Sequence, residues 1–107
     1  MKPNVLCIDD SVENLEIFKE VLVDDFDVTT EPDPYIALDL LKKEVFDTVL
    51  LDIRMPLMSG FEFYEKALGQ LDLSKTAFMF MTVNTDPALR LKAYQLGADD
   101  FISKPIS

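Results

Sequence analysis

Short apolar runs alternate with amphipathic segments along this 107-residue chain, and this alternation constrains its fold more than any other feature. Continuous apolar runs are typical of strands buried on both faces of a sheet, whereas apolar residues repeated every three or four positions are typical of helices packed on it. Strands that alternate with helices form a parallel sheet with right-handed crossovers. We therefore predict an α/β domain with the order βαβαβαβαβ. Its strands are expected at residues 5–8, 26–30, 49–52, 77–81 and 100–103.

Capping residues mark the ends of the predicted helices. Ser11 and Ser59 precede two of them, and the pairs Asp33-Pro34 and Asp86-Pro87 place an N-cap before a proline in the first turn. Gly97 is expected to end the last helix, because glycine readily adopts the left-handed conformation common there. The residues predicted to face the sheet are Val12, Leu15, Phe18 and Leu22 in the first helix, Ala37, Leu40 and Leu41 in the second, Phe61, Tyr64 and Leu68 in the third, and Leu89, Ala93 and Leu96 in the fourth.

Length and composition limit the classes of function. The chain is long enough for one domain and too short for two. Its net charge of −10 argues against a nucleic-acid partner, because no basic stripe is available to neutralise phosphates. No run is long enough to span a membrane, so no membrane partner is expected. The single Cys7 excludes an internal disulfide and favours a cytoplasmic location.

The chain contains no histidine, which excludes several catalytic mechanisms. Histidine-dependent triads, histidine-ligated zinc and self-phosphorylation on an imidazole are all impossible. The three glycines form neither a Walker A loop nor a dinucleotide-binding fingerprint. Any phosphoryl group must therefore come from another molecule.

Polar residues follow the predicted strands at their carboxyl ends. Asp9 and Asp10 follow the first strand, Asp52 ends the third, and Thr82 and Lys104 follow the fourth and fifth. A flavodoxin-like, doubly wound, five-stranded parallel sheet has the known strand order 2-1-3-4-5, and applying that order places Asp10 opposite Asp52 at the switch point. Carboxylates this close repel one another unless a cation lies between them, and such oxygen ligands suit Mg²⁺. The ammonium of Lys104 and the hydroxyl of Thr82 could then contact the other oxygens of a phosphoryl group.

These residues combine with others into a pattern that covers almost the whole chain. The pattern resembles the receiver domain of two-component response regulators. The residues that carry the resemblance are Asp9-Asp10, Asp52, Met55-Pro56, Ser59-Gly60, Thr82, Gly97-Ala98-Asp99, Phe101 and Lys104-Pro105.

The resemblance implies a function and a role for each site residue. A sensor histidine kinase or phosphotransfer protein would pass a phosphoryl group from phosphohistidine to Asp52, with Mg²⁺ bound. The metal ligands would be Asp10, Asp52 and the backbone carbonyl of Arg54, with Asp9 acting through water. Phe101 would turn inward as a switch when Thr82 moves toward the phosphoryl group. Signal output would run through the surface formed by residues 88–101. The chain would catalyse only its own aspartyl phosphorylation and dephosphorylation.

Each residue also has an ordinary structural interpretation when it is taken alone. Asp9 and Asp10 could cap a helix, Thr82 could end a strand, Lys104 could be a surface lysine and Phe101 could belong to the core. What favours function for the polar residues is their convergence on one edge of one sheet, whereas the role of Phe101 rests on the resemblance. The pairs Asp24-Asp25 and Asp99-Asp100 are interpreted as solvated turn residues.

Three features depart from the usual receiver pattern. Val83 follows Thr82 where a smaller residue is common, which predicts a narrower phosphoryl pocket. Arg54 and Asn84 flank the site and are expected to set the lifetime of the phosphorylated form. A fifth helix usually follows Lys104-Pro105, so we expect residues 1–107 to be a receiver domain truncated at its C-terminus, with apolar surface beside strands three to five. We expect either that the chain is excised from a longer multidomain regulator with a C-terminal output domain, which we favour, or that a second copy in a homodimer covers that surface.

Two alternatives belong to other functional classes. A hydrolase of the haloacid-dehalogenase type also forms an aspartyl phosphate after a strand, but its motif requires an acid at position 54, where this chain has Arg54. An interaction module that works without phosphorylation usually lacks part of the acidic set or the lysine, and both are present here.

Overall fold

The computed structural model of the protein describes residues 2–82 and 87–103, and for residues 101–103 it describes the backbone. Strands and helices alternate in the predicted order throughout this part. The strands are β1 (Asn4–Ile8), β2 (Asp27–Glu31), β3 (Thr48–Asp52), β4 (Ala77–Thr82) and β5 (Asp100–Ser103). The helices are α1 (Val12–Leu22), α2 (Pro34–Lys43), α3 (Gly60–Gln70) and α4 (Pro87–Gln95).

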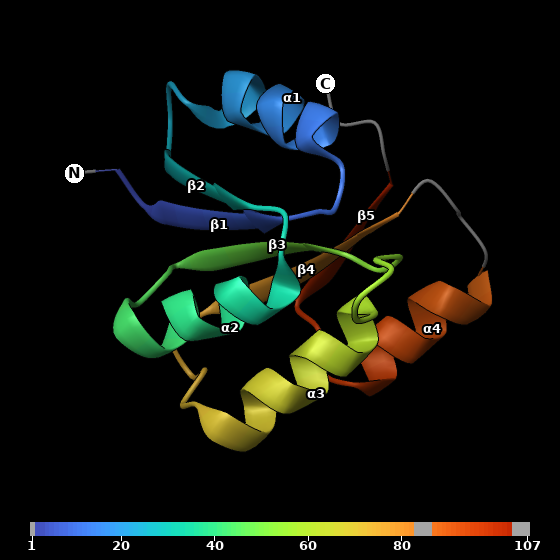
Figure 1. Cartoon of the computed structure of the whole chain (residues 1–107). Coiled ribbons are helices and arrows are strands. Elements are labelled where there is room, and N and C mark those ends of the chain that lie inside the picture. The colour runs from blue at the N-terminus through green and yellow to red at the C-terminus, as the bar shows by residue number, and fades with distance from the viewer. Residues whose placement is uncertain (1, 83–86, 104–107) are drawn as a thin grey trace.

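The sheet is parallel and has the strand order β2-β1-β3-β4-β5, which confirms the predicted topology. Figure 1 shows α1 on one side of the sheet and α2, α3 and α4 on the other, as a doubly wound fold requires. The helices after β1 and β3 thus leave to opposite faces, and the crevice between these two strand ends is the switch point. The prediction about a fifth helix concerns residues after Ser103, outside the described part.

The predicted caps are confirmed for α1, α2 and α3. The hydroxyl of Ser11 accepts the backbone N–H of Asn14, and that of Ser59 accepts the N–H of Glu62. The carboxylate of Asp33 accepts the N–H groups of Tyr35 and Ile36. These bonds satisfy donors that a helix leaves unpaired in its first turn. Asp86, the cap predicted for α4, lies outside the described residues.

Gly97 follows α4 with a φ of 99°, as the predicted helix stop requires. The second strand begins one residue later than predicted, because the N–H of Phe26 donates to the carbonyl of Leu22 and still belongs to the turn after α1. Asp24 and Asp25 are exposed turn residues, as predicted. The interpretation of Asp99-Asp100 as solvated turn residues was incomplete. The carboxylate of Asp99 accepts the N–H of Phe78 at 2.8 Å, and Asp100 already belongs to β5.

Most residues predicted to face the sheet do so, but two do not. Val12 is 58% exposed and Leu68 is 46% exposed. Val12 is the first residue of α1, which contributes Leu15 and Phe18 to the core. In α3, Ala67 takes the inward position, and Leu68 lies one residue, or about 100° of helix rotation, farther around. The core of α2 and α3 also contains Leu38 and Phe63, which helical spacing did not single out.

The core consists of one apolar cluster on each face of the sheet. The cluster under α1 includes Leu50 and Met81, which are 6% and 0% exposed, and Met79 packs against it with partial burial. The prediction that apolar surface beside strands three to five faces water is therefore wrong for Leu50 and Met81. Cys7 lies in the same cluster. Burial, and secondarily the charge of Asp9, raise the pKa of its thiol to about 12, so Cys7 packs as a small apolar residue and is not a nucleophile at neutral pH.

Candidate functional site

Three carboxylates meet at the carboxyl ends of β1 and β3. The two strands are neighbours, with Ile8 paired to Leu51, so the residues that follow these positions lie at one edge of the sheet. Oxygen atoms of Asp9, Asp10 and Asp52 all lie within 4.8 Å of one another. We call these three residues the acidic pocket.

The members of the acidic pocket differ in exposure. Asp9 is 1% exposed and Asp52 is 5% exposed, whereas Asp10 is open to solvent. A buried carboxylate needs hydrogen bonds or a cation, since removing its charge from water is costly. One open carboxylate beside two buried ones leaves a route from solvent into the pocket.

Asp9 is held in place by the first turn of α1. Its Oδ1 accepts the backbone N–H of Ser11 at 3.0 Å, and its Oδ2 accepts from Nδ2 of Asn14 at 3.3 Å. Both oxygens of Asp9 therefore have a partner that fixes the plane of the carboxylate. Asn14 was not predicted as part of the site. The sequence could have indicated Asn14 through its position three residues after the Ser11 N-cap, because a side chain at that position lies back over the strand end.

The backbone around Asp52 is fixed from two sides. The N–H of Ile53 donates to the carbonyl of Met81, and the N–H of Gly60 donates to the carbonyl of Ile53 at 2.8 Å. A Cβ on Gly60 would overlap the carbonyl oxygen of Asp52 and lie 2.9 Å from the Cα of Ile53. Only glycine allows α3 to begin this close to the end of β3. The close approach also limits the positions that the intervening loop can adopt.

The other predicted site residues lie at the same edge or outside the described part. Thr82 is buried at the end of β4 and follows Met81, the residue paired with Asp52. Arg54 lies in the loop after β3 with an exposed side chain. Phe101 lies in β5, paired with Phe80, and only its backbone is described. Lys104, Val83 and Asn84 lie outside the described residues.

The acidic pocket fits a hard divalent cation. Two like charges about 4 Å apart repel by roughly 4 kcal/mol at the effective dielectric of a protein surface, so three carboxylates favour a bound positive charge. Carboxylate oxygens, with water, are the ligands that Mg²⁺ prefers in proteins.

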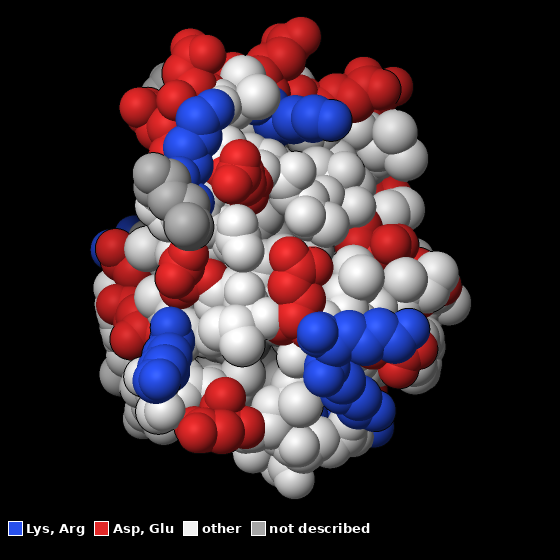
Figure 2. All heavy atoms as spheres, turned by 90° about the vertical axis from the view of Figure 1, so that its left-hand side faces the viewer, with Lys and Arg blue, Asp and Glu red and all other residues white. Residues whose placement is uncertain are grey.

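Figure 2 shows the face at the other end of the strands, where the acidic side chains gather mainly at the top, over α1 and the turn that follows it.

A comparison with protein families decides what kind of domain carries this pocket. A model described as the response regulator receiver domain matches residues 5–107. The chain belongs to this family. The receiver is a module of two-component signalling, and an acidic pocket such as Asp9, Asp10 and Asp52 is typical of receivers that accept a phosphoryl group and bind a divalent metal. A receiver implies a histidine kinase as partner. The match decides against the haloacid-dehalogenase alternative.

Receiver domains of known structure share the fold of this chain. The chemotaxis protein CheY4 of Vibrio cholerae superimposes with a TM-score of 0.92 at 30% identity, over 100% of this chain and 90% of that one. The BeF3-activated DrrB receiver domain superimposes with a TM-score of 0.86 at 27% identity, over 100% of this chain and 88% of that one.

The similar curated proteins are longer than this receiver. Protein-glutamate methylesterase/protein-glutamine glutaminase of Photorhabdus laumondii is 36% identical over 97% of this chain and 30% of its own length. The protein of the same name from Escherichia coli K12 is 37% identical over the same shares. The chain thus spans about 30% of these relatives, and the similarity covers only their receiver part. Within the described part of the chain, no helix is long and apolar enough to cross a membrane.

Proposed function

We propose that Asp52 accepts a phosphoryl group from a phosphohistidine of a sensor histidine kinase or phosphotransfer protein, with Mg²⁺ bound in the acidic pocket. The supporting observation is the position of Asp52 at the end of β3, within 4.8 Å of oxygens from Asp9 and Asp10. A carboxylate oxygen attacks phosphorus, the P–O bond forms as the P–N bond to the imidazole breaks, and the imidazole recovers a proton from solvent. An ionised carboxylate needs no general base for this attack.

The residues around Asp52 would each stabilise a different charge, either that of the metal ion or that of one phosphoryl oxygen. Asp10, Asp52 and the carbonyl of Arg54 would hold Mg²⁺, with Asp9 acting through water. Bound there, Mg²⁺ would neutralise charge on the phosphoryl oxygens. Thr82 would donate its hydroxyl proton to one phosphoryl oxygen, and Lys104 would place its ammonium beside another. Asn14 would act as a positioning residue, because it orients the carboxylate of Asp9.

The proposal is tested by phosphorylating the chain in vitro. Incubation with Mg²⁺ and a small phosphodonor should add the mass of one phosphoryl group, as measured by intact mass spectrometry. Asp52→Asn should remove this uptake and leave the far-ultraviolet circular dichroism unchanged. Asp24→Asn, an exposed aspartate in the turn after α1, is the matched control and should be labelled like the wild type. Labelling of Asp52→Asn on another carboxylate to the wild-type extent would show that the assignment is wrong.

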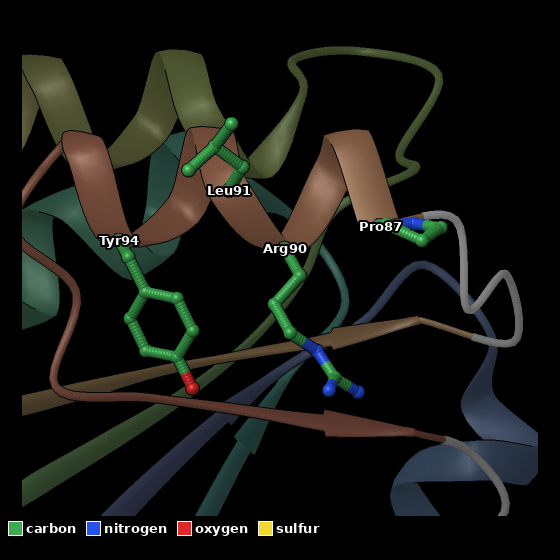
Figure 3. Close-up of a pocket in the computed structure, with 4 residues that line it drawn as sticks. All are labelled: Pro87, Arg90, Leu91 and Tyr94. Carbon is green, nitrogen blue, oxygen red and sulfur yellow. The ribbon is translucent and has the colours of Figure 1, made fainter.

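We also propose how phosphorylation reaches the surface. Thr82 would move toward the phosphoryl group and Phe101 would turn inward, which changes the surface formed by residues 88–101. Figure 3 shows Arg90 and Tyr94 extending from α4 toward β5, while Leu91 extends from the same helix away from β5. These residues and Pro87 line a pocket of about 280 Å³, which offers a partner both apolar contact and hydrogen-bonding groups. A switch of this kind requires two states that phosphorylation biases differently.

We propose further that residues 1–107 form the receiver part of a longer cytoplasmic regulator with a C-terminal output domain. The support is the share of about 30% that this chain covers in its curated relatives. The receiver itself would catalyse only its own aspartyl phosphorylation and dephosphorylation. A homodimer is the alternative, and a dimer mass in light scattering of the 107-residue chain would favour it.

A further inference from the structure

A second recess lies next to the acidic pocket, between the loop after β3 and helix α4. It is an open groove of about 630 Å³. We call it the basic groove, because of the two cations described below. Its lining residues are Ile53, Arg54, Met55, Pro56, Ser59, Phe61, Leu89 and Lys92.

The charge of the groove is opposite to that of the chain. The chain has 20 acidic and 10 basic residues, yet the described residues that line the groove include two cations, Arg54 and Lys92, and no carboxylate. Both side chains are exposed, and neither is within salt-bridge distance of a carboxylate in the described part of the chain. An anionic group that enters the groove would therefore not compete with a carboxylate of the described protein for these two cations.

The floor of the groove is apolar and firmly packed. Phe61 is buried, and its ring meets that of Phe80 edge-on at a centroid distance of 4.9 Å. The ammonium of Lys92 lies 4.8 Å from the centroid of Phe61, which holds this cation over the ring. A cation held in place loses less conformational freedom when it binds a partner. Met55, Pro56 and Leu89 add apolar surface beside it.

We propose that the basic groove binds an acidic amphipathic segment of a partner protein, in which carboxylates are interleaved with apolar side chains. The carboxylates would pair with Arg54 and Lys92, and the apolar side chains would pack on the floor and walls of the groove. Electrostatic complementarity of this kind selects the partner and its orientation. A nucleic acid fits less well, because two cations neutralise few phosphates and the chain's net charge of −10 repels a polyanion.

The groove differs from the α4 pocket described above, although its α4 residues also belong to the surface of residues 88–101 that is proposed for signal output. The groove takes Leu89 and Lys92 from α4, whereas the other pocket takes Pro87, Arg90, Leu91 and Tyr94. The two recesses share no lining residue and lie on different sides of one helix. Docking in the basic groove does not depend on phosphoryl transfer, so it can be tested without phosphorylation.

The test is a titration followed by the amide chemical shifts of the isotope-labelled 107-residue chain. The probe is a synthetic peptide in which glutamate alternates with leucine, and the control peptide has glutamine in place of glutamate. The acidic peptide should shift amides at residues 53–61 and 89–92, and the glutamine peptide should bind more weakly. Lys92→Gln should weaken binding of the acidic peptide roughly fivefold, a change that corresponds to about 1 kcal/mol.

Matched variants make the result decisive. Lys66→Gln removes an exposed lysine of α3 that does not line the groove, and it should leave the affinity unchanged. Arg54→Gln should weaken binding as Lys92→Gln does. The proposal would be overturned by equal binding of both peptides, by a weakening in Lys66→Gln as large as that in Lys92→Gln, or by chemical-shift changes confined to the side of α4 that carries Arg90 and Tyr94. Tighter binding of a single-stranded oligonucleotide, lost in Lys92→Gln, would also overturn it. The protein is unphosphorylated throughout, so none of these results bears on Asp52 as phosphoacceptor.

Discussion

The acidic pocket and the basic groove are neighbours at the carboxyl edge of the sheet, but they are built in different ways. Asp9 and Asp52 are almost completely buried, and Asp9 accepts hydrogen bonds from Ser11 and Asn14. The cations of the groove are exposed, and among the described contacts only Lys92 has a fixed neighbour, the ring of Phe61. The pocket therefore depends on the end of the sheet for its geometry, whereas the groove depends on a loop and one helix.

This difference matches what each region is proposed to bind. A divalent cation requires oxygen ligands at defined distances, and orienting the carboxylates through hydrogen bonds maintains those distances. A docked peptide tolerates more variation, because rim charges contribute little each and apolar contact is not directional. Changes at the backbone beneath the pocket should thus have larger effects than changes of single charges in the groove.

The largest effect is expected from Gly60→Ala. The new methyl group would overlap the carbonyl oxygen of Asp52 and force β3 and α3 apart, so the free energy of unfolding should fall by roughly 2 to 3 kcal/mol. Gly69→Ala is the matched control in the same helix. Apart from the neighbouring residues and the backbone of α3 itself, no atom lies within 4 Å of its added Cβ, so it should stabilise the protein by about 0.5 to 1 kcal/mol through helix propensity. Urea unfolding measures both changes. Equal stability of the two variants would mean that the end of β3 is less rigid than the comparison requires.

Asp10→Ala should have the next largest effect, on the binding of Mg²⁺. It removes the exposed carboxylate of the acidic pocket, a proposed metal ligand, and leaves Asp9 and Asp52 in place, so Mg²⁺ affinity should fall at least tenfold, or by about 1.4 kcal/mol. Isothermal titration calorimetry gives the dissociation constants. Asp24→Ala removes the same charge from an exposed turn and serves as the control. If both variants weaken Mg²⁺ binding to the same extent, the ion responds to net charge and the pocket is not its site.

The sequence predicts most of the fold because the apolar runs, the helix caps and the helix stop all indicate the same arrangement of strands and helices. The apolar runs identify the strands, Ser11, Asp33 and Ser59 begin helices, and Gly97 follows the last one. Helical spacing was less reliable for single side chains. It placed Val12 and Leu68 toward the sheet, because it finds the apolar face of a helix but not where that helix crosses the sheet.

The sequence predicted the acidic pocket better than the groove. Residues at the ends of parallel strands converge whatever the details of packing, so Asp9, Asp10 and Asp52 could be brought together from strand order alone. Lys92 and Arg54 meet only because α4 packs beside the loop after β3, which no local pattern specifies. Asn14 was missed for a similar reason, since its hydrogen bond to Asp9 depends on the angle at which α1 leaves β1.

The smallest expected effect concerns Thr82, which lies at the end of β4 beside the acidic pocket and before the segment that leads to α4. If its hydroxyl relays phosphorylation, Thr82→Ala should still be phosphorylated at Asp52. The change in amide hydrogen exchange that phosphorylation causes at residues 88–101 should disappear, a loss of about 1 kcal/mol in opening free energy. Thr82→Ser retains the hydroxyl and should restore the response, which separates the hydrogen bond from packing by the methyl group. An equal response in the wild type and in Thr82→Ala would show that the pocket acts on α4 by another route. The backbone of the loop after β3 would then be the first place to look, because it contributes Arg54 both to the proposed metal site and to the basic groove.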